Sequence, residues 1–161
     1  MELVPVLHNI RSVHNVGSIF RTGDGAGVSR LWLTGYTPAP IDRFGRIRDD
    51  LAKVSLGAER RIPWQQAADL STAIIELKDA GFLILALEQH PQSCNIFDFT
   101  FPEGCKKAAL IVGNEVEGIS EDELSEADAI IEIPMQGTKE SLNVSVATGI
   151  ALYTIRQDFR K

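Results

Sequence analysis

The chain of 161 residues has 44% hydrophobic and 24% charged residues, which is ordinary for one globular domain spanning residues 1–161. Its formal net charge of −6 argues against a protein held on nucleic acid by bulk electrostatics, although a local basic patch can still bind RNA. The apolar runs are too short to span a membrane and the N-terminus lacks a basic signal region, so we expect a cytoplasmic protein with no membrane partner.

The cysteine and histidine content gives no indication of a metal site. Cys94 and Cys105 match no zinc-ligand spacing and are expected to be free thiols in a reducing compartment. The three histidines are scattered along the chain. We therefore expect no metal.

The first predicted elements are a strand at residues 3–7 and a helix that Asn15 caps. The apolar positions of this helix follow the spacing i, i+3, i+4, i+7, and they are Val16, Ile19, Phe20 and Gly23. The glycines that follow can supply the left-handed turn out of the helix. A second strand is predicted at residues 29–33.

The middle of the chain is predicted to contain a partly helical charged stretch at residues 42–56 and a strand at residues 60–64. A helix is predicted at residues 65–79, with Gly81 as its stop. Its buried stripe consists of Leu70, Ala73, Ile74 and Leu77.

Continuous apolar runs at residues 82–87, 108–112 and 129–133 predict strands covered on both faces. Ser120 and Glu123 have capping-box spacing before a short helix, and the last helix is predicted at residues 143–159. The alternation of strands and helices predicts an α/β fold with a mostly parallel sheet flanked by helices. Ligands bind at the carboxyl ends of such strands, so the loops after Leu87, Val112 and Ile133 are the candidate site.

Three polar stretches could carry chemistry. The first, NIRSVHNVGSIFRTGDGAG at residues 9–27, places Asn15 and Arg21 on one helix, although a cap and a surface charge would explain both. The second, LIVGNEVEGIS at residues 110–120, ends a strand at Gly113, where a ligand can approach closely. The third, IPMQGTKESLNVSVATGIALY at residues 133–153, leads into the last helix, and an ordinary helix cap would also explain its polar residues.

Taken together, these stretches resemble the three motifs of the SpoU/TrmH family of the SPOUT superfamily of RNA methyltransferases. The resemblance extends from about residue 9 to residue 153 and agrees in order, spacing and polar residues. It implies a C-terminal deep trefoil knot, a homodimer with the first-motif and last helices near its interface, and S-adenosylmethionine as cofactor. The family reaction is methyl transfer to a ribose 2′-hydroxyl.

The resemblance also implies the residues of the site. Those that would act on the ribose are Arg21, Asn15, Glu115, Ser141 and Asn143. Those that would hold the cofactor, largely through backbone groups, are Leu87, Gly113, Ile133, Leu142, Met135 and Gly118. A guanidinium keeps its proton far above neutral pH, so we expect Arg21 to bind RNA phosphate and stabilise the developing alkoxide rather than act as a general base.

RNA needs positive charge near such a site. The predicted local patch consists of Arg11, Arg43, Arg46 and Arg48, each of which could instead be a solvated surface residue. Because the chain is short for the family, tRNA is favoured over rRNA as the substrate. Two alternatives stay open: a non-catalytic RNA-binding or assembly protein on the same fold, and an enzyme that methylates a base nitrogen.

Overall fold

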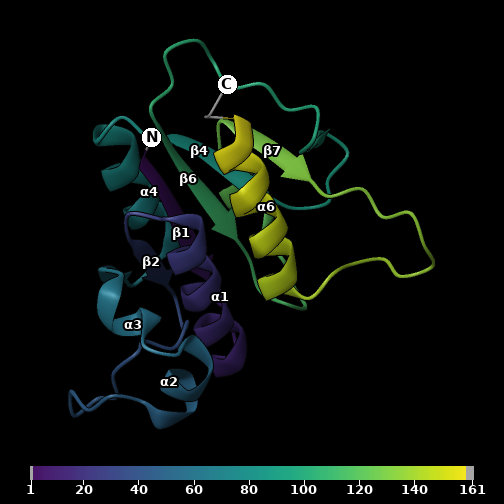
Figure 1. Cartoon of the computed structure of the whole chain (residues 1–161). Coiled ribbons are helices and arrows are strands. Elements are labelled where there is room, and N and C mark those ends of the chain that lie inside the picture. Colours follow the sequence, from purple (N-terminus) through teal and green to yellow (C-terminus); the bar gives the residue numbers. More distant parts are fainter. Residues whose placement is uncertain (1, 159–161) are drawn as a thin grey trace.

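A seven-stranded, wholly parallel sheet forms the centre of the molecule in the computed structural model, which describes residues 2–158 (Figure 1). The strands are β1 (Glu2–His8), β2 (Leu31–Thr34), β3 (Trp64–Ala67), β4 (Leu83–Leu87), β5 (Cys94–Asn95), β6 (Lys107–Val112) and β7 (Ala129–Glu132). Their order across the sheet is β3-β2-β1-β6-β4-β7-β5. The predicted α/β class with a mostly parallel sheet is confirmed.

Helices cover both faces of this sheet. They are α1 (Val13–Ala26), α2 (Asp49–Ser55), α3 (Ala58–Arg61), α4 (Leu70–Asp79), α5 (Glu121–Leu124) and α6 (Val144–Asp158). Buried residues of α1, α2, α3 and α6 pack in one cluster with alternate strand residues, and those of α4 and α5 pack with the remaining ones. Strands covered on both faces read as continuous apolar runs, which is why β4 and β6 were predicted correctly.

Several predicted boundaries are wrong. The strand expected at residues 60–64 is the short helix α3 followed by β3, and the helix expected from residue 65 begins only at Leu70, after the cap Asp69. The partly helical stretch expected at residues 42–56 is confirmed, with α2 as its helical part. The short edge strand β5 was not predicted, and the expected end of the last helix at Phe159 lies outside the described residues.

Helix α1 begins earlier than the sequence suggested. Ser12 is its N-cap and accepts a hydrogen bond from the backbone N–H of Asn15 at 3.2 Å, so Asn15 lies in the first turn. Its side chain is therefore free to contact other parts of the chain. The helix ends at Gly27 in the left-handed conformation (φ 68°), as the glycine-rich sequence predicts.

Candidate functional site

A cavity of about 460 Å³ opens at the carboxyl ends of β4, β6 and β7. Its walls come from the loops that follow these strands and from the start of α6. All six residues expected to hold a cofactor line it: Leu87, Gly113, Gly118, Ile133, Met135 and Leu142. The predicted position of the site, at the edge where parallel strands end, therefore coincides with a cavity large enough for a small-molecule ligand.

The floor of the cavity depends on two glycines packed against each other. A Cβ at Gly113 would lie 2.7 Å from both the carbonyl carbon and the oxygen of Gly118 and 2.6 Å from Ile119 Cγ1. Gly118 has φ +69°, and a Cβ there would meet the Glu88 carboxylate at 2.5 Å. Only glycine allows this approach, which keeps the end of β6 open to a ligand.

The loop that closes the cavity, residues 133–142, offers backbone groups to a ligand. Within the described part of the chain, the only hydrogen bond to its main chain is from Gln89 Nε2 to the carbonyl of Glu140, at 2.6 Å. The N–H and C=O groups of Ile133 and Leu142 are consequently available. Unpaired main-chain donors and acceptors beside apolar walls suit a ligand that combines flat apolar surface with a polar edge.

Glu115 joins the cavity to the start of α1. Its carboxylate accepts hydrogen bonds from the backbone N–H groups of Arg11 (3.0 Å) and Ser12 (3.3 Å) and from Asn15 Nδ2 (3.0 Å). Partial burial acts to raise the pKa of Glu115, but these hydrogen bonds together lower the pKa below its usual value. Glu115 is thus an anion fixed at a helix N-terminus, where the helix dipole also favours it.

Asn143 completes this connection from α6. Its Nδ2 donates to Asn15 Oδ1 at 3.2 Å, while its Oδ1 accepts from the backbone N–H of Ser145 at 2.9 Å. Ser141 also lines the cavity and is exposed. Four of the five residues expected to act on the ribose are therefore brought together: Glu115, Ser141 and Asn143 in the cavity wall, with Asn15 bonded to two of them.

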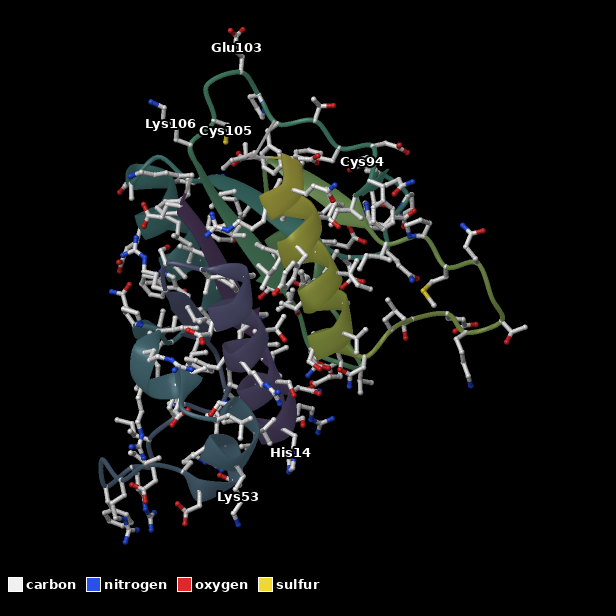
Figure 2. The ribbon with its side chains drawn as sticks, in the orientation of Figure 1. His14, Lys53, Cys94, Glu103, Cys105 and Lys106 are labelled. Atoms are coloured by element: carbon white, nitrogen blue, oxygen red, sulfur yellow. The ribbon has the colours of Figure 1, made fainter. Side chains whose placement is uncertain are left out.

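Arg21 is not among the residues that line the cavity. It lies six residues after Asn15, which corresponds to about 9 Å along α1 and about 120° around it. Its side chain is exposed, on the same stripe of α1 as His14, which points into solvent in Figure 2. Among the described residues it has no ion-pair or hydrogen-bond partner. Within one chain, Arg21 is thus separated from the other predicted site residues.

The predicted RNA-binding arginines lie in loops that follow the carboxyl ends of β1 and β2. Arg11 is exposed just before α1. Arg43, Arg46 and Arg48 belong to the loop between β2 and α2, which projects beyond α2 in Figure 1. Arg46 pairs with Asp42 at 3.0 Å and Arg48 pairs with Asp50 at 3.3 Å, so part of the charge of each arginine is already compensated.

Two residues at the cavity were not singled out by sequence reasoning. Glu88 follows β4 directly, and its carboxylate accepts from the backbone N–H groups of Gln89 (2.9 Å) and Ile119 (3.1 Å). Asn114 is buried, and its Oδ1 accepts from the N–H groups of Val116 (2.7 Å) and Glu117 (2.8 Å). A polar residue directly after a buried strand was the available signal for both.

A buried histidine stands beside this edge of the sheet, at the end of β1. His8 is 5% exposed, and its ring contacts Thr34 Oγ1 through Nδ1 (2.9 Å) and Glu123 Oε1 through Nε2 (2.8 Å). Burial lowers the pKa of His8 below its ordinary value, and the neighbouring Glu123 opposes this only in part. His8 is thus favoured in its neutral form.

Residues 2–158 contain neither a metal-binding cluster nor a membrane-spanning helix. No group of three or more His, Cys, Asp or Glu side chains there could hold a metal ion. No helix in that range is both long and apolar enough to cross a membrane. Cys94 and Cys105 are free thiols, as predicted.

The chain is similar in sequence to known proteins. The sequence profile of the SpoU rRNA Methylase family matches residues 2–153. The 23S rRNA (guanosine-2′-O-)-methyltransferase RlmB of Neisseria meningitidis is 31% identical over 155 residues, which are 96% of this chain and 58% of that protein. This chain spans about 60% of the length of the curated relatives it matches.

Solved structures agree with this similarity. The AdoMet-bound rRNA methyltransferase from Sinorhizobium meliloti superposes with a TM-score of 0.86 at 29% identity, over 97% of this chain and 56% of that one. The TrmH/SpoU tRNA modifying enzyme of A. aeolicus superposes with a TM-score of 0.82 at 30% identity, over 99% of this chain and 76% of that one.

Proposed function

Because this chain belongs to the SpoU rRNA methylase family, we propose that it transfers a methyl group from S-adenosylmethionine to a ribose 2′-hydroxyl of RNA. The observation that carries the proposal is the convergence of all six expected cofactor-binding residues on one cavity. Ribose chemistry is supported by the similarity to RlmB, which is named as a guanosine 2′-O-methyltransferase.

The cavity fits the proposed cofactor in size and chemistry. Its volume of about 460 Å³ lies in the range of small-molecule sites. Main-chain groups of Gly113, Ile133 and Leu142 can pair with an adenine edge, while Leu87 and Met135 supply apolar contact. When bound, the cofactor supplies a methyl group already activated by the sulfonium, so the protein has to orient it and exclude water.

The residues around the cavity then divide the remaining tasks. Asn15, Glu115 and Asn143 hold the start of α1 against the start of α6, and Ser141 lies exposed in the cavity wall to position the ribose. Arg21 binds the RNA phosphate and stabilises negative charge that develops on the hydroxyl oxygen. Positioning of this kind can contribute ~7–11 kcal/mol to catalysis.

The separation of Arg21 from its own cavity is a reason to propose that the enzyme works as a homodimer. Helix α6 buries Thr148, Ala151, Leu152 and Ile155 on one side, yet Val146 and Tyr153 on its other side are 51% and 55% exposed. An apolar helix surface of this kind is usually covered.

Helix α1 contributes Arg21 to the same surface. A Cβ at Gly25 of α1 would lie 2.9 Å from Tyr153 Oη, and one at Gly149 of α6 would lie 3.3 Å from Thr22 of α1. A partner docked on α6 would therefore also lie next to Arg21. Gly149 of α6 thus packs closely against α1 of its own chain.

Sedimentation equilibrium tests the homodimer. We expect a dimer for the wild type and a monomer for Val146→Glu, because a charge would be buried at the interface. Lys53→Glu on α2, whose side chain points to solvent in Figure 2, is the matched control and should stay dimeric. A monomeric wild type would overturn the proposal.

We also propose that the C-terminal part of the chain forms a deep trefoil knot, as other family members do. It is supported by family membership and by the loop at residues 133–143, which carries the chain from β7 to α6 beside α1. Stretching the unfolded chain by its ends provides the test. A knot keeps the extended length below the ~3.3–3.6 Å per residue that an open chain reaches.

Among RNA substrates we favour tRNA, with rRNA as the second candidate, and a cytoplasmic location. The A. aeolicus structure, described as a tRNA modifying enzyme, is matched over 76% of its length, compared with 56% for the S. meliloti rRNA enzyme. Arg11, Arg43, Arg46 and Arg48 are the proposed phosphate contacts.

Mass spectrometry of nucleosides from cells with and without the protein tests the function. We expect one 2′-O-methylnucleoside to disappear from tRNA or rRNA when the gene is deleted, and no methylation of a substrate that carries 2′-deoxyribose at the target. A methylated base in place of the methylated ribose would favour base-nitrogen chemistry. Absence of any heat of S-adenosylmethionine binding in calorimetry would favour a non-catalytic RNA-binding protein.

A further inference from the structure

The loop between β2 and α2 carries a hydrogen-bonded tip whose exposed aromatic ring has no role in the proposed function. Ile41 and Ile47 form an antiparallel bridge at its base. Asp42 accepts hydrogen bonds from the backbone N–H groups of Phe44 (2.8 Å) and Arg46 (3.0 Å) and from Arg46 Nε (3.0 Å). The backbone hydrogen bond from Arg46 is the main cause that lowers the pKa of Asp42, so the carboxylate holds the turn at neutral pH.

Phe44 stands at this tip with its ring in solvent. It is 65% exposed, the largest exposure of any aromatic residue described, and it packs against no core cluster. The guanidinium carbons of Arg43 and Arg46 lie 4.8 Å and 5.0 Å from the ring centroid. Both distances are within the range of cation–π contact. The ring therefore lies beside two guanidinium groups. Arg46 is also paired with Asp42 at 3.0 Å, whereas Arg43 has no ion-pair partner among the described residues.

The loop that carries the tip begins at the same edge of the sheet as the cavity, the edge formed by the carboxyl ends of the strands. The loop leaves the carboxyl end of β2, and only β1 separates β2 from β6, so the two strand ends are about 10 Å apart. At the start of the loop, Asn114 Nδ2 contacts Tyr36 Oη at 2.5 Å, which ties it to the cavity wall. RNA bound at the cavity would therefore lie beside the start of this loop, and the tip projects from the loop in Figure 1.

We propose that Phe44 stacks on an unpaired base of the RNA substrate while Arg43 and Arg46 contact the phosphates on either side of it. This inference rests on the proposed RNA methyltransferase function. It adds that the substrate must present an unstacked nucleotide, in a loop or bulge, near the methylated ribose, because bases inside a duplex cannot meet the ring.

The chemistry of the tip favours RNA over a protein partner. Residues 41–48 carry three arginines and one aspartate, although Asp49 and Asp50 follow directly. Two of the arginines are paired with aspartates, which leaves Arg43 without an ion-pair partner among the described residues. An exposed ring flanked by guanidinium groups offers one stacking surface and two phosphate contacts, which is the pattern of single-strand recognition.

Binding of a short oligoadenylate and of the same strand in an RNA duplex tests the inference. The variant Phe44→Leu stays apolar but loses the ring, and Phe44→Trp keeps a ring. We expect Phe44→Leu to bind the single strand about tenfold more weakly than wild type and the duplex equally well, since stacking contributes ~1–3 kcal/mol per base. Phe44→Trp should retain affinity, and its indole fluorescence should be quenched by the single strand beyond the change in Trp32 and Trp64.

Phe97→Leu is the matched control. Phe97 is 56% exposed, and its ring has no cation–π contact among the described residues. This variant should bind both RNAs as wild type does, and thermal unfolding should show that all three variants are folded.

Unchanged single-strand affinity of Phe44→Leu together with no added quenching in Phe44→Trp would overturn the stacking role. If methylation of cellular RNA persists in that case, only this inference fails and the proposed function stands. If Phe44→Leu instead changes the oligomeric state in sedimentation and leaves RNA affinity intact, the ring belongs to a protein interface and the inference is wrong. A wild type that binds no oligoadenylate also overturns it.

Discussion

Asn143 Nδ2 donates a hydrogen bond to Asn15 Oδ1 at 3.2 Å, although the two residues are 128 positions apart in the chain. With the bond from Asn15 to Glu115, it fastens the first turn of α1 to the cavity and to the start of α6. The candidate site is therefore assembled from distant segments.

Replacement of Arg21 by lysine is expected to lower the rate of methyl transfer about 100-fold or more, since lysine lacks the planar fork that spans phosphate and alkoxide. Affinity for S-adenosylmethionine should not change, because Arg21 does not line the cavity. Transfer of a radiolabelled methyl group and calorimetry measure the two effects. Arg61→Lys, which alters an exposed arginine paired with Asp24, is the control. Near-normal turnover by Arg21→Lys would refute the requirement for a planar guanidinium.

Substitution of Glu115 by glutamine should destabilise the fold by about 0.5–1.5 kcal/mol, because three donors lose a charged acceptor that is partly exposed. Denaturant unfolding measures the change, and methyl transfer should also fall as α1 loosens. Glu117→Gln is the matched control, since the Glu117 side chain has no hydrogen-bond partner among residues 2–158. Equal losses in both variants would mean that the position of the charge is irrelevant.

An alanine at Gly113 is expected to destabilise the protein by ~1–3 kcal/mol and to weaken cofactor binding, because its Cβ would overlap the backbone of Gly118. Gly137→Ala, in the loop that closes the same cavity, has no atom within 4 Å of its added Cβ and should behave as wild type. Chemical denaturation and calorimetry with S-adenosylmethionine test both. Wild-type affinity in Gly113→Ala would contradict the proposed cofactor site.

The buried His8 makes stability dependent on pH. The unfolded chain takes up a proton on this residue near its ordinary pKa of 6.5, whereas the folded chain does so only at lower pH. The free energy of unfolding should therefore be fully present above pH 6.5 and fall as the pH drops below it. Measurements made above pH 4.5, the ordinary value for Glu123, separate His8 from the carboxylate, whose pKa is also lowered.

The variant His8→Gln should remove this fall, and His14→Gln, which changes an exposed histidine, should retain it. Denaturant titrations over the interval from above pH 6.5 down to just above pH 4.5 provide the measurement. If the free energy of unfolding of His8→Gln falls with decreasing pH as steeply as that of the wild type, the pH dependence belongs to other groups.

Strands and helices with a strong apolar pattern were predictable from the sequence. Strands β4 and β6 are continuous apolar runs because both faces are covered, and the buried residues of α4 have helical spacing. Strand β3 was misplaced because Gln65 and Gln66 at the sheet edge are both exposed, so the strand shows no alternation of apolar and polar residues. The turn at residues 41–48 depends on hydrogen bonds to the Asp42 carboxylate. Such bonds leave no periodic hydrophobic pattern in the sequence, so the turn was not predicted.

The site was predictable where residues lie directly after a strand. Gly113 and Ile133 could be placed in this way, because all parallel strands end at one edge of the sheet. The role of Asn15 as a link rather than a cap was not predictable, since Ser12 also satisfies the capping pattern three residues earlier. The position of Arg21 depends on how α1 is rotated against α6, which the helical period alone does not determine.

The link between α1 and α6 has a consequence for protein synthesis. The N-terminal part of the chain leaves the ribosome first, but Asn15 finds its last partner only when Asn143 has emerged. Unfinished chains should therefore be unable to bind the methyl donor, which arrested nascent chains that end before residue 143 can test. Translation would thus complete the candidate site late, only when α6 has been synthesised.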